Sequence, residues 1–103
     1  MKRPKIPFLL PLALIALAGS ASAQTGTLQA RSMAASCASC HGTNGLAAPG
    51  MVALAGYARA DLIKAMADFK SGARPATIMH QLAKGYSDQQ IEAIAGYFAA
   101  QKQ

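Results

Sequence analysis

The chain has 103 residues, which is enough for one small domain. Its formal net charge is +6, but Lys2, Arg3 and Lys5 lie at the extreme N-terminus. Residues 24–103 keep seven basic and four acidic residues, a net charge of +3. They contain no basic run interleaved with aromatic residues, so the pattern excludes a nucleic-acid-binding protein.

The N-terminus has the features of a secretory signal peptide. A positively charged start precedes an apolar run over residues 6–18, and Ala21-Ser22-Ala23 fits a small-x-small cleavage pattern. The run is shorter than the about 20 residues that a transmembrane helix needs. An uncleaved N-terminal anchor is the alternative. We predict a signal peptide over residues 1–23, export to the periplasm, and one domain over residues 24–103 without a membrane span.

A helix over residues 28–36 is expected to lead into Cys37-Ala38-Ser39-Cys40-His41, which holds both cysteines of the chain. The spacing C-x-x-C-H is that of a c-type haem attachment site. Two thiols one helical turn apart each add to a vinyl group of one porphyrin, and the histidine offers an imidazole nitrogen to the iron. We therefore predict one covalent haem c, bound by Cys37 and Cys40, with His41 as an axial ligand.

Three other interpretations of these residues are weaker. A structural zinc site needs four ligands, and the only other histidine of the chain is His80. A thioredoxin-like redox pair accompanies a βαβ pattern, and the sequence predicts no strand. A structural disulfide would suit an exported protein, but this one would close a very small loop and add little stability.

After the motif, the sequence predicts a loop over residues 42–56, where glycines and Pro49 break any periodicity. A helix over residues 59–70 follows, and Gly72 and Pro75 end it. Its apolar stripe consists of Leu62, Ile63, Met66 and Phe69.

Two more helices complete an all-α fold. A short one is predicted over residues 77–84. The last one begins after Ser87, which forms a capping box with Gln90. Its apolar stripe consists of Ile91, Ile94, Ala95, Phe98 and Ala99.

The second axial ligand decides whether a haem iron only carries electrons or is open to other chemistry. The candidates are Met33, Met51, Met66, Met79 and His80. The first two methionines lie close to the attachment motif in the chain, and the third belongs to an apolar stripe, where methionine is commonly a core residue. Met79 follows far enough along the chain to reach the opposite face of the haem. We predict Met79 as the second ligand, with His80 as the alternative.

Residues 24–103 resemble a class I cytochrome c along their whole length. The motif from Cys37 to His41 matches the haem site of that family. Pro49 resembles the proline whose carbonyl accepts a hydrogen bond from the proximal histidine, an interaction that orients the ring. Gly96 resembles the glycine that lets the first and last helices approach closely. The resemblance implies about four short helices wrapped around one haem.

A narrower resemblance lies in residues 69–74 and 77–88. They are similar to the cytochrome subunit of flavocytochrome c sulfide dehydrogenase and, more loosely, to cytochrome c4 domains. In that family the methionine at the position of Met79 is the sixth iron ligand. The resemblance implies an electron-transfer protein rather than an enzyme. It further implies a haem subunit whose partner, an FAD-containing flavoprotein, oxidises sulfide and passes the electrons to the haem.

Two other functions stay open. The protein could be a free-standing shuttle to a terminal oxidase or another periplasmic redox enzyme. An enzyme or sensor would need an open iron site, which Met79 would close. An exposed apolar patch near the haem edge would favour a permanent subunit, and residues 46–54 are the candidate for it.

Overall fold

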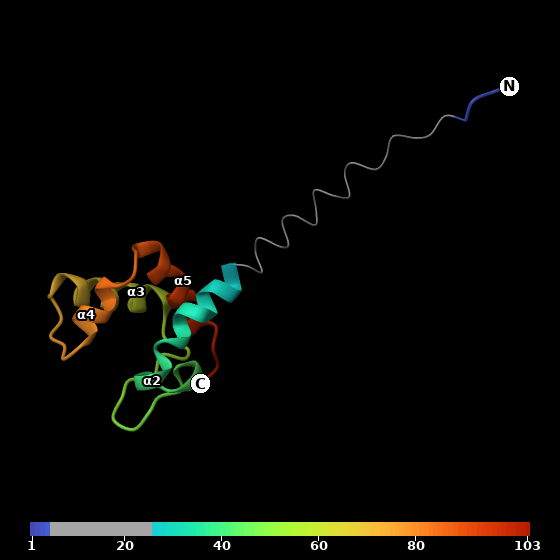
Figure 1. Ribbon diagram of the computed structural model, residues 1–103. Coiled ribbons are helices and arrows are strands. Elements are labelled where there is room, and N and C mark those ends of the chain that lie inside the picture. The colour runs from blue at the N-terminus through green and yellow to red at the C-terminus, as the bar shows by residue number, and fades with distance from the viewer. Residues whose placement is uncertain (5–25) are drawn as a thin grey trace.

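The computed structural model describes residues 1–4 and 26–103, and within these ranges it contains helices and no strand (Figure 1). This confirms the predicted all-α fold. All but residues 1–4 of the predicted signal peptide lies outside the described residues. Within the described ranges, no helix is long and apolar enough to cross a membrane. The elements are a helix over residues 26–35, α2 (Ala38–His41), the 3₁₀ helix η1 (Thr43–Gly45), α3 (Arg59–Ser71), α4 (Met79–Lys84) and α5 (Asp88–Ala99).

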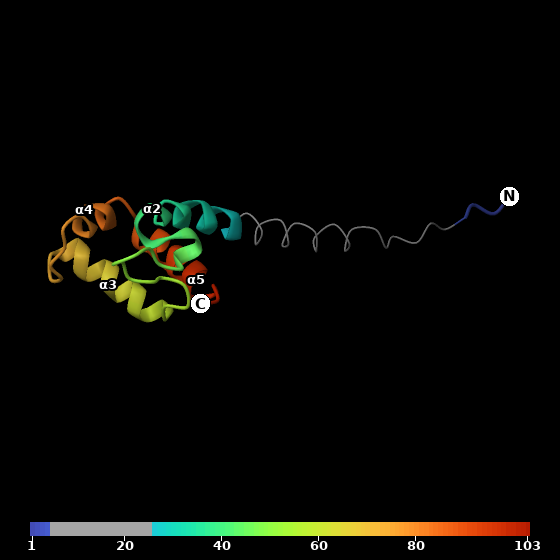
Figure 2. The same cartoon turned by 90° about the horizontal axis from the view of Figure 1, so that it is seen from below.

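The helix α3 forms the base on which α4 and α5 pack (Figure 2). It ends at Gly72, whose φ of +81° is the left-handed conformation that glycine adopts without strain. Leu62 and Met66 of the predicted stripe are buried, which places that face of α3 against the other helices. On the outer side, Lys64 and Asp68 form an i, i+4 ion pair at 2.6 Å.

The start of α5 confirms the predicted capping box. The N–H of Gln90 donates to Ser87 Oγ at 3.1 Å, and the Ser87 N–H donates to Gln90 Oε1 at 2.8 Å. Two backbone donors that a helix start would otherwise leave unpaired are thereby satisfied. The predicted stripe is buried except for Ala99.

The helix α4 begins at Met79, two residues later than predicted. Ile78 precedes it with φ −136°, outside the helical region, and residues 71–78 are all exposed. Because this segment buries no apolar face, nothing in the packing extends the helix toward Thr77.

Two clusters of buried apolar side chains form the core. The larger cluster joins the helix over residues 26–35 with the loop, α3 and α5, and the smaller cluster joins α3, α4 and α5. Ile63 and Tyr86 pack against both clusters and so connect them. The larger cluster contains Ala34, Leu54, Leu62, Ile94, Ala95 and Phe98, and the smaller one Met66, Ala83 and Ile91.

A close approach to α5 occurs at Gly45 rather than at Gly96. Among the described residues, a Cβ at Gly96 would meet Arg59 Nε at 3.7 Å, an ordinary contact, so these residues show no close approach of the kind that the resemblance implied. A Cβ at Gly45 would lie 2.8 Å from the backbone nitrogen of Ala55 and 2.9 Å from Phe98 Cδ1. Gly45 therefore marks the place where the loop crosses α5.

We predict that the variant Gly45→Ala is much less stable than the matched variant Gly50→Ala. Both glycines have positive φ (+74° and +76°), but no atom lies within 4 Å of a Cβ at Gly50. Overpacking should lower the free energy of unfolding of Gly45→Ala by about 1–3 kcal/mol more. Denaturant unfolding followed by circular dichroism measures this, and equal losses in the two variants would contradict it.

Candidate functional site

The three chemically distinctive residues of the motif lie on one helical turn. Cys37 is the N-cap of α2, and Cys40 and His41 are its last two residues. The His41 N–H donates to the Cys37 carbonyl at 2.9 Å, which closes the turn between them. Both thiols are free; Cys37 is half-buried and Cys40 is exposed. The turn therefore presents two thiols and an imidazole at the spacing that haem attachment requires.

The two thiols differ in environment. Burial raises the pKa of the Cys37 thiol, and the nearby Cys40 raises it further, while a hydrogen bond with Ser36 acts in the opposite direction. The Cys37 thiol is therefore protonated at neutral pH.

The ring of His41 is held by the backbone of the following loop. Its Nδ1 lies 2.6 Å from the carbonyl oxygen of Val52. Because a carbonyl oxygen only accepts hydrogen bonds, Nδ1 carries the proton, and Nε2 of the neutral ring keeps its lone pair for a metal. The prediction that the Pro49 carbonyl accepts this hydrogen bond is wrong, because Val52 takes that place.

The loop around Gly45 positions the Val52 carbonyl. The Gly45 carbonyl accepts the N–H groups of Leu54 and Ala55, two and three residues after Val52, at 2.8 and 2.9 Å. Next to Gly45, Asn44 has φ +54° and accepts a 2.8 Å hydrogen bond from the Tyr97 hydroxyl of α5. The Gly45 carbonyl thus anchors the segment that follows Val52, and the Tyr97 hydroxyl anchors Asn44 next to Gly45.

Met79 and His80, the two candidates for the second ligand, face different surroundings. Met79 is the first residue of α4 and packs, half-buried, against the smaller core cluster. Successive side chains on a helix point about 100° apart, so His80 faces another side. Met66 is buried in that cluster, which confirms its interpretation as a core residue.

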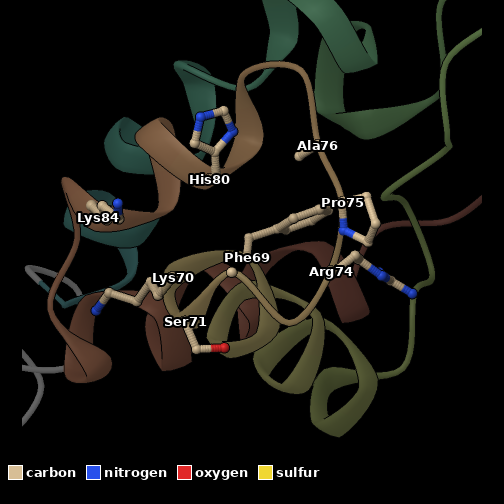
Figure 3. A pocket seen from close by; sticks show the side chains of 9 residues that line it. Phe69, Lys70, Ser71, Arg74, Pro75, Ala76, His80 and Lys84 are labelled. Atoms are coloured by element: carbon tan, nitrogen blue, oxygen red, sulfur yellow. The ribbon is translucent and has the colours of Figure 1, made fainter.

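His80 lines a hollow of about 260 Å³ between α4 and the end of α3 (Figure 3). Its Nδ1 is buried and has no hydrogen-bond partner within the described part of the chain. The hollow is also lined by Lys70 and Arg74, but Figure 3 shows these two side chains pointing to opposite sides. The Arg74 guanidinium lies 5.4 Å from the centre of the Phe69 ring, and the Lys70 ammonium donates to the Tyr86 carbonyl at 2.6 Å. The cationic groups therefore do not converge on a ligand.

The apolar side chains near the candidate ligands fit a flat, mostly apolar cofactor. Val52, beside His41, is 61% exposed. Ile78, which precedes α4, and Leu82, which lies on it, are 54% and 46% exposed. A haem between the loop and α4 would bury such side chains and gain their hydrophobic free energy. Within the described ranges, no group of three or more His, Cys, Asp or Glu residues comes close enough to hold a metal ion by itself.

We predict that Pro49→Ala leaves the His41 Nδ1–H proton of the haem-loaded protein unchanged. Its NMR resonance and its protection from solvent exchange should match those of the parent protein, because Val52 supplies the acceptor. The variant Gly45→Ala, which disturbs the loop that carries Val52, should shift or broaden the same resonance. A loss of protection in Pro49→Ala would show that the proline carbonyl is the acceptor after all.

The cytochrome c family model matches residues 29–102. The cytochrome subunit of sulfide dehydrogenase from Chlorobaculum tepidum is 41% identical over 63 residues, which cover 61% of this chain and 57% of that protein. Cytochrome c4 from Pseudomonas aeruginosa is 39% identical over 92 residues, 88% of this chain and 46% of that protein. The thiosulfate dehydrogenase electron acceptor from Stutzerimonas stutzeri is 41% identical over 69 residues, 65% of this chain and 32% of that protein.

In each of these comparisons the chain spans less than two thirds of the relative's length. The family match nevertheless runs from the helix over residues 26–35 to the end of α5, and it includes the motif and the loop that orients His41. Cytochromes c carry electrons on covalently attached haem c, and Cys37 and Cys40 stand at the spacing for that attachment. This all-helical chain belongs to the cytochrome c family.

Proposed function

We propose that the protein is a periplasmic monohaem cytochrome that transfers single electrons, with the haem attached to Cys37 and Cys40 and the iron held by His41 and Met79. The observation that carries this proposal is the hydrogen bond between His41 and the Val52 carbonyl. This hydrogen bond fixes the tautomer with the proton on Nδ1 and leaves Nε2 free, which is the form of histidine that binds a metal.

Each residue of the site has a defined task in this proposal. When bound, the haem supplies an iron that takes up and releases one electron. Cys37 and Cys40 tether it, and the Val52 carbonyl orients the His41 ring and raises its basicity. Met79 would supply the second protein ligand to the iron, and its thioether would keep substrates away from the metal. A thioether there also raises the reduction potential relative to a second histidine.

The predicted signal peptide supports the periplasmic location. After cleavage behind Ala23, residues 24–103 would remain as the mature cytochrome domain. The haem would then be attached outside the cytoplasm, in the compartment where its redox partners lie.

For the electron donor, we favour an FAD-containing sulfide dehydrogenase of which this protein is the haem subunit. The flavin would take two electrons from sulfide, and this protein would remove them one at a time. Residues 32–58 contain no Asp, Glu, Lys or Arg. Leu46 and Met51 in this uncharged region are 56% and 42% exposed, which suits a lasting apolar interface. The similarity to the cytochrome subunit from Chlorobaculum tepidum supports the same assignment.

A free-standing shuttle is the second candidate. The relative named thiosulfate dehydrogenase electron acceptor favours this role. Both candidates use the same haem site, and they differ in whether a stable complex with the donor exists.

We predict that Met79→Ala abolishes the weak long-wavelength charge-transfer band of the ferric protein, because that band reports a thioether bound to the iron. His80→Ala is the matched control and should keep the band, since the two side chains face different surroundings. Optical spectra of the purified oxidised proteins measure the band. If Met79→Ala retains it, the ligand assignment is wrong.

We predict that the native protein co-purifies with a flavin-containing partner and that Leu46→Asp weakens this complex by about tenfold or more, since a charge replaces an apolar contact. Leu28→Asp is the control, because Leu28 is also exposed, at 63%, but lies on the first helix. Flavin absorbance in the isolated complex and titration of the partner measure the effect. A protein that purifies alone and binds no flavoprotein would favour the free shuttle.

A further inference from the structure

A hydrogen bond joins the haem-attachment turn to the far end of the helix that starts with Met79. The Tyr86 hydroxyl lies 2.7 Å from Ser36 Oγ. Ser36 directly precedes Cys37, and Tyr86 lies in the turn between α4 and α5. The bond therefore connects the segment that carries the thiols and His41 with the segment that carries the other proposed iron ligand.

The direction of this hydrogen bond follows from a second one. Ser36 Oγ donates its only hydrogen to the Met33 carbonyl at 2.8 Å. The Tyr86 hydroxyl must therefore donate to Ser36. Hydrogen bonds arranged in such a chain polarise and strengthen one another.

The backbone of Tyr86 is held by hydrogen bonds to α3 and α4. Its carbonyl accepts a 2.6 Å hydrogen bond from the half-buried ammonium of Lys70 on α3. Its N–H donates to the Ala83 carbonyl of α4 at 3.3 Å. The Tyr86 ring also packs against both core clusters. The position of the Tyr86 hydroxyl relative to Ser36 therefore depends on the position of α4.

The opposite end of α4 lacks such support. Met79 follows the exposed segment of residues 71–78, and α4 has only six residues. This helix packs chiefly against α3, and its single buried residue, Ala83, lies in the smaller core cluster with Ile91 of α5. Ala83 is near the C-terminal end of α4, so the Met79 end of so short a helix shifts easily unless another contact holds the helix against the attachment turn.

We propose that the Ser36–Tyr86 hydrogen bond is a latch that keeps α4 closed against the haem-attachment turn and so keeps the Met79 sulfur at the iron. Ser36 and Tyr86 act as positioning residues, and this inference rests on the proposed ligation by Met79. An added ligand competes only for the fraction of protein in which the sulfur is away. Breaking the latch enlarges that fraction and lowers the apparent dissociation constant of the added ligand in proportion.

Imidazole binding to the ferric, haem-loaded protein tests the latch. We expect Tyr86→Phe and Ser36→Ala each to bind imidazole about two- to tenfold more tightly than the parent protein, the range that corresponds to one neutral hydrogen bond. The double variant should bind no more tightly than either single one, because both substitutions remove the same interaction. Ser36→Thr keeps the hydroxyl and should restore the affinity of the parent protein.

Tyr97→Phe is the matched control. It removes a tyrosine hydrogen bond of similar length, 2.8 Å, but one that holds the loop beside His41 rather than α4. Its imidazole affinity should stay within about twofold of the parent value, smaller than the effect of one hydrogen bond across α4. Denaturant unfolding of all variants distinguishes the proposed effect on α4 from a general loss of stability. A general loss would change the imidazole affinity of Tyr86→Phe and Tyr97→Phe alike.

The outcomes separate the latch from the ligand assignment. If the charge-transfer band is present in the parent protein but Tyr86→Phe and Ser36→Ala bind imidazole like the parent, or Tyr97→Phe matches them, the latch is overturned and Met79 stays a ligand. If Met79→Ala leaves the ferric spectrum unchanged, both the ligand assignment and the latch are overturned.

Discussion

The approach of Gly45 to the backbone of residues 54–55 and to Phe98 is the contact on which the His41 side of the site depends. The Gly45 carbonyl accepts the N–H groups of Leu54 and Ala55, and no larger residue would fit against Phe98. With this crossing in place, the Val52 carbonyl lies 2.6 Å from His41 Nδ1. The tautomer of His41, the proposed iron ligand, is thus determined by how a loop packs against the last helix.

The two proposed ligands are held in different ways. His41 lies in a short helix that backbone hydrogen bonds connect to the adjoining residues. Its ring also donates a hydrogen bond to the Val52 carbonyl. Met79 begins a six-residue helix after an exposed segment, and it relies on apolar packing and on contacts at the other end of α4. A thioether is also a weaker ligand than an imidazole. The stability of the closed site should therefore be decided on the Met79 side, where each single contact has a larger effect.

The sequence predicted those features that depend on side-chain type or on periodicity. The motif from Cys37 to His41, the stripes of α3 and α5 and the capping box of Ser87 all follow from local chemistry. It did not predict the Val52 carbonyl as the acceptor for His41, because every residue type has a backbone carbonyl. The resemblance led to Pro49 instead. It also predicted a close approach of the first and last helices at Gly96, whereas the close contact with α5 in the described residues is made by the loop at Gly45. Which glycine faces a backbone depends on how the loop crosses α5, and no local pattern encodes that crossing.

The most direct test of the central claim is the proton NMR spectrum of the ferrous, haem-loaded protein with its methionine methyl groups labelled. A methyl group on a sulfur bound to the iron lies over the porphyrin ring and is strongly shielded by the ring current. One three-proton resonance is expected far upfield, and it should disappear only when Met79 is replaced. A spectrum without such a resonance, or one in which it belongs to Met51 or Met66, would contradict a haem iron closed by His41 and Met79.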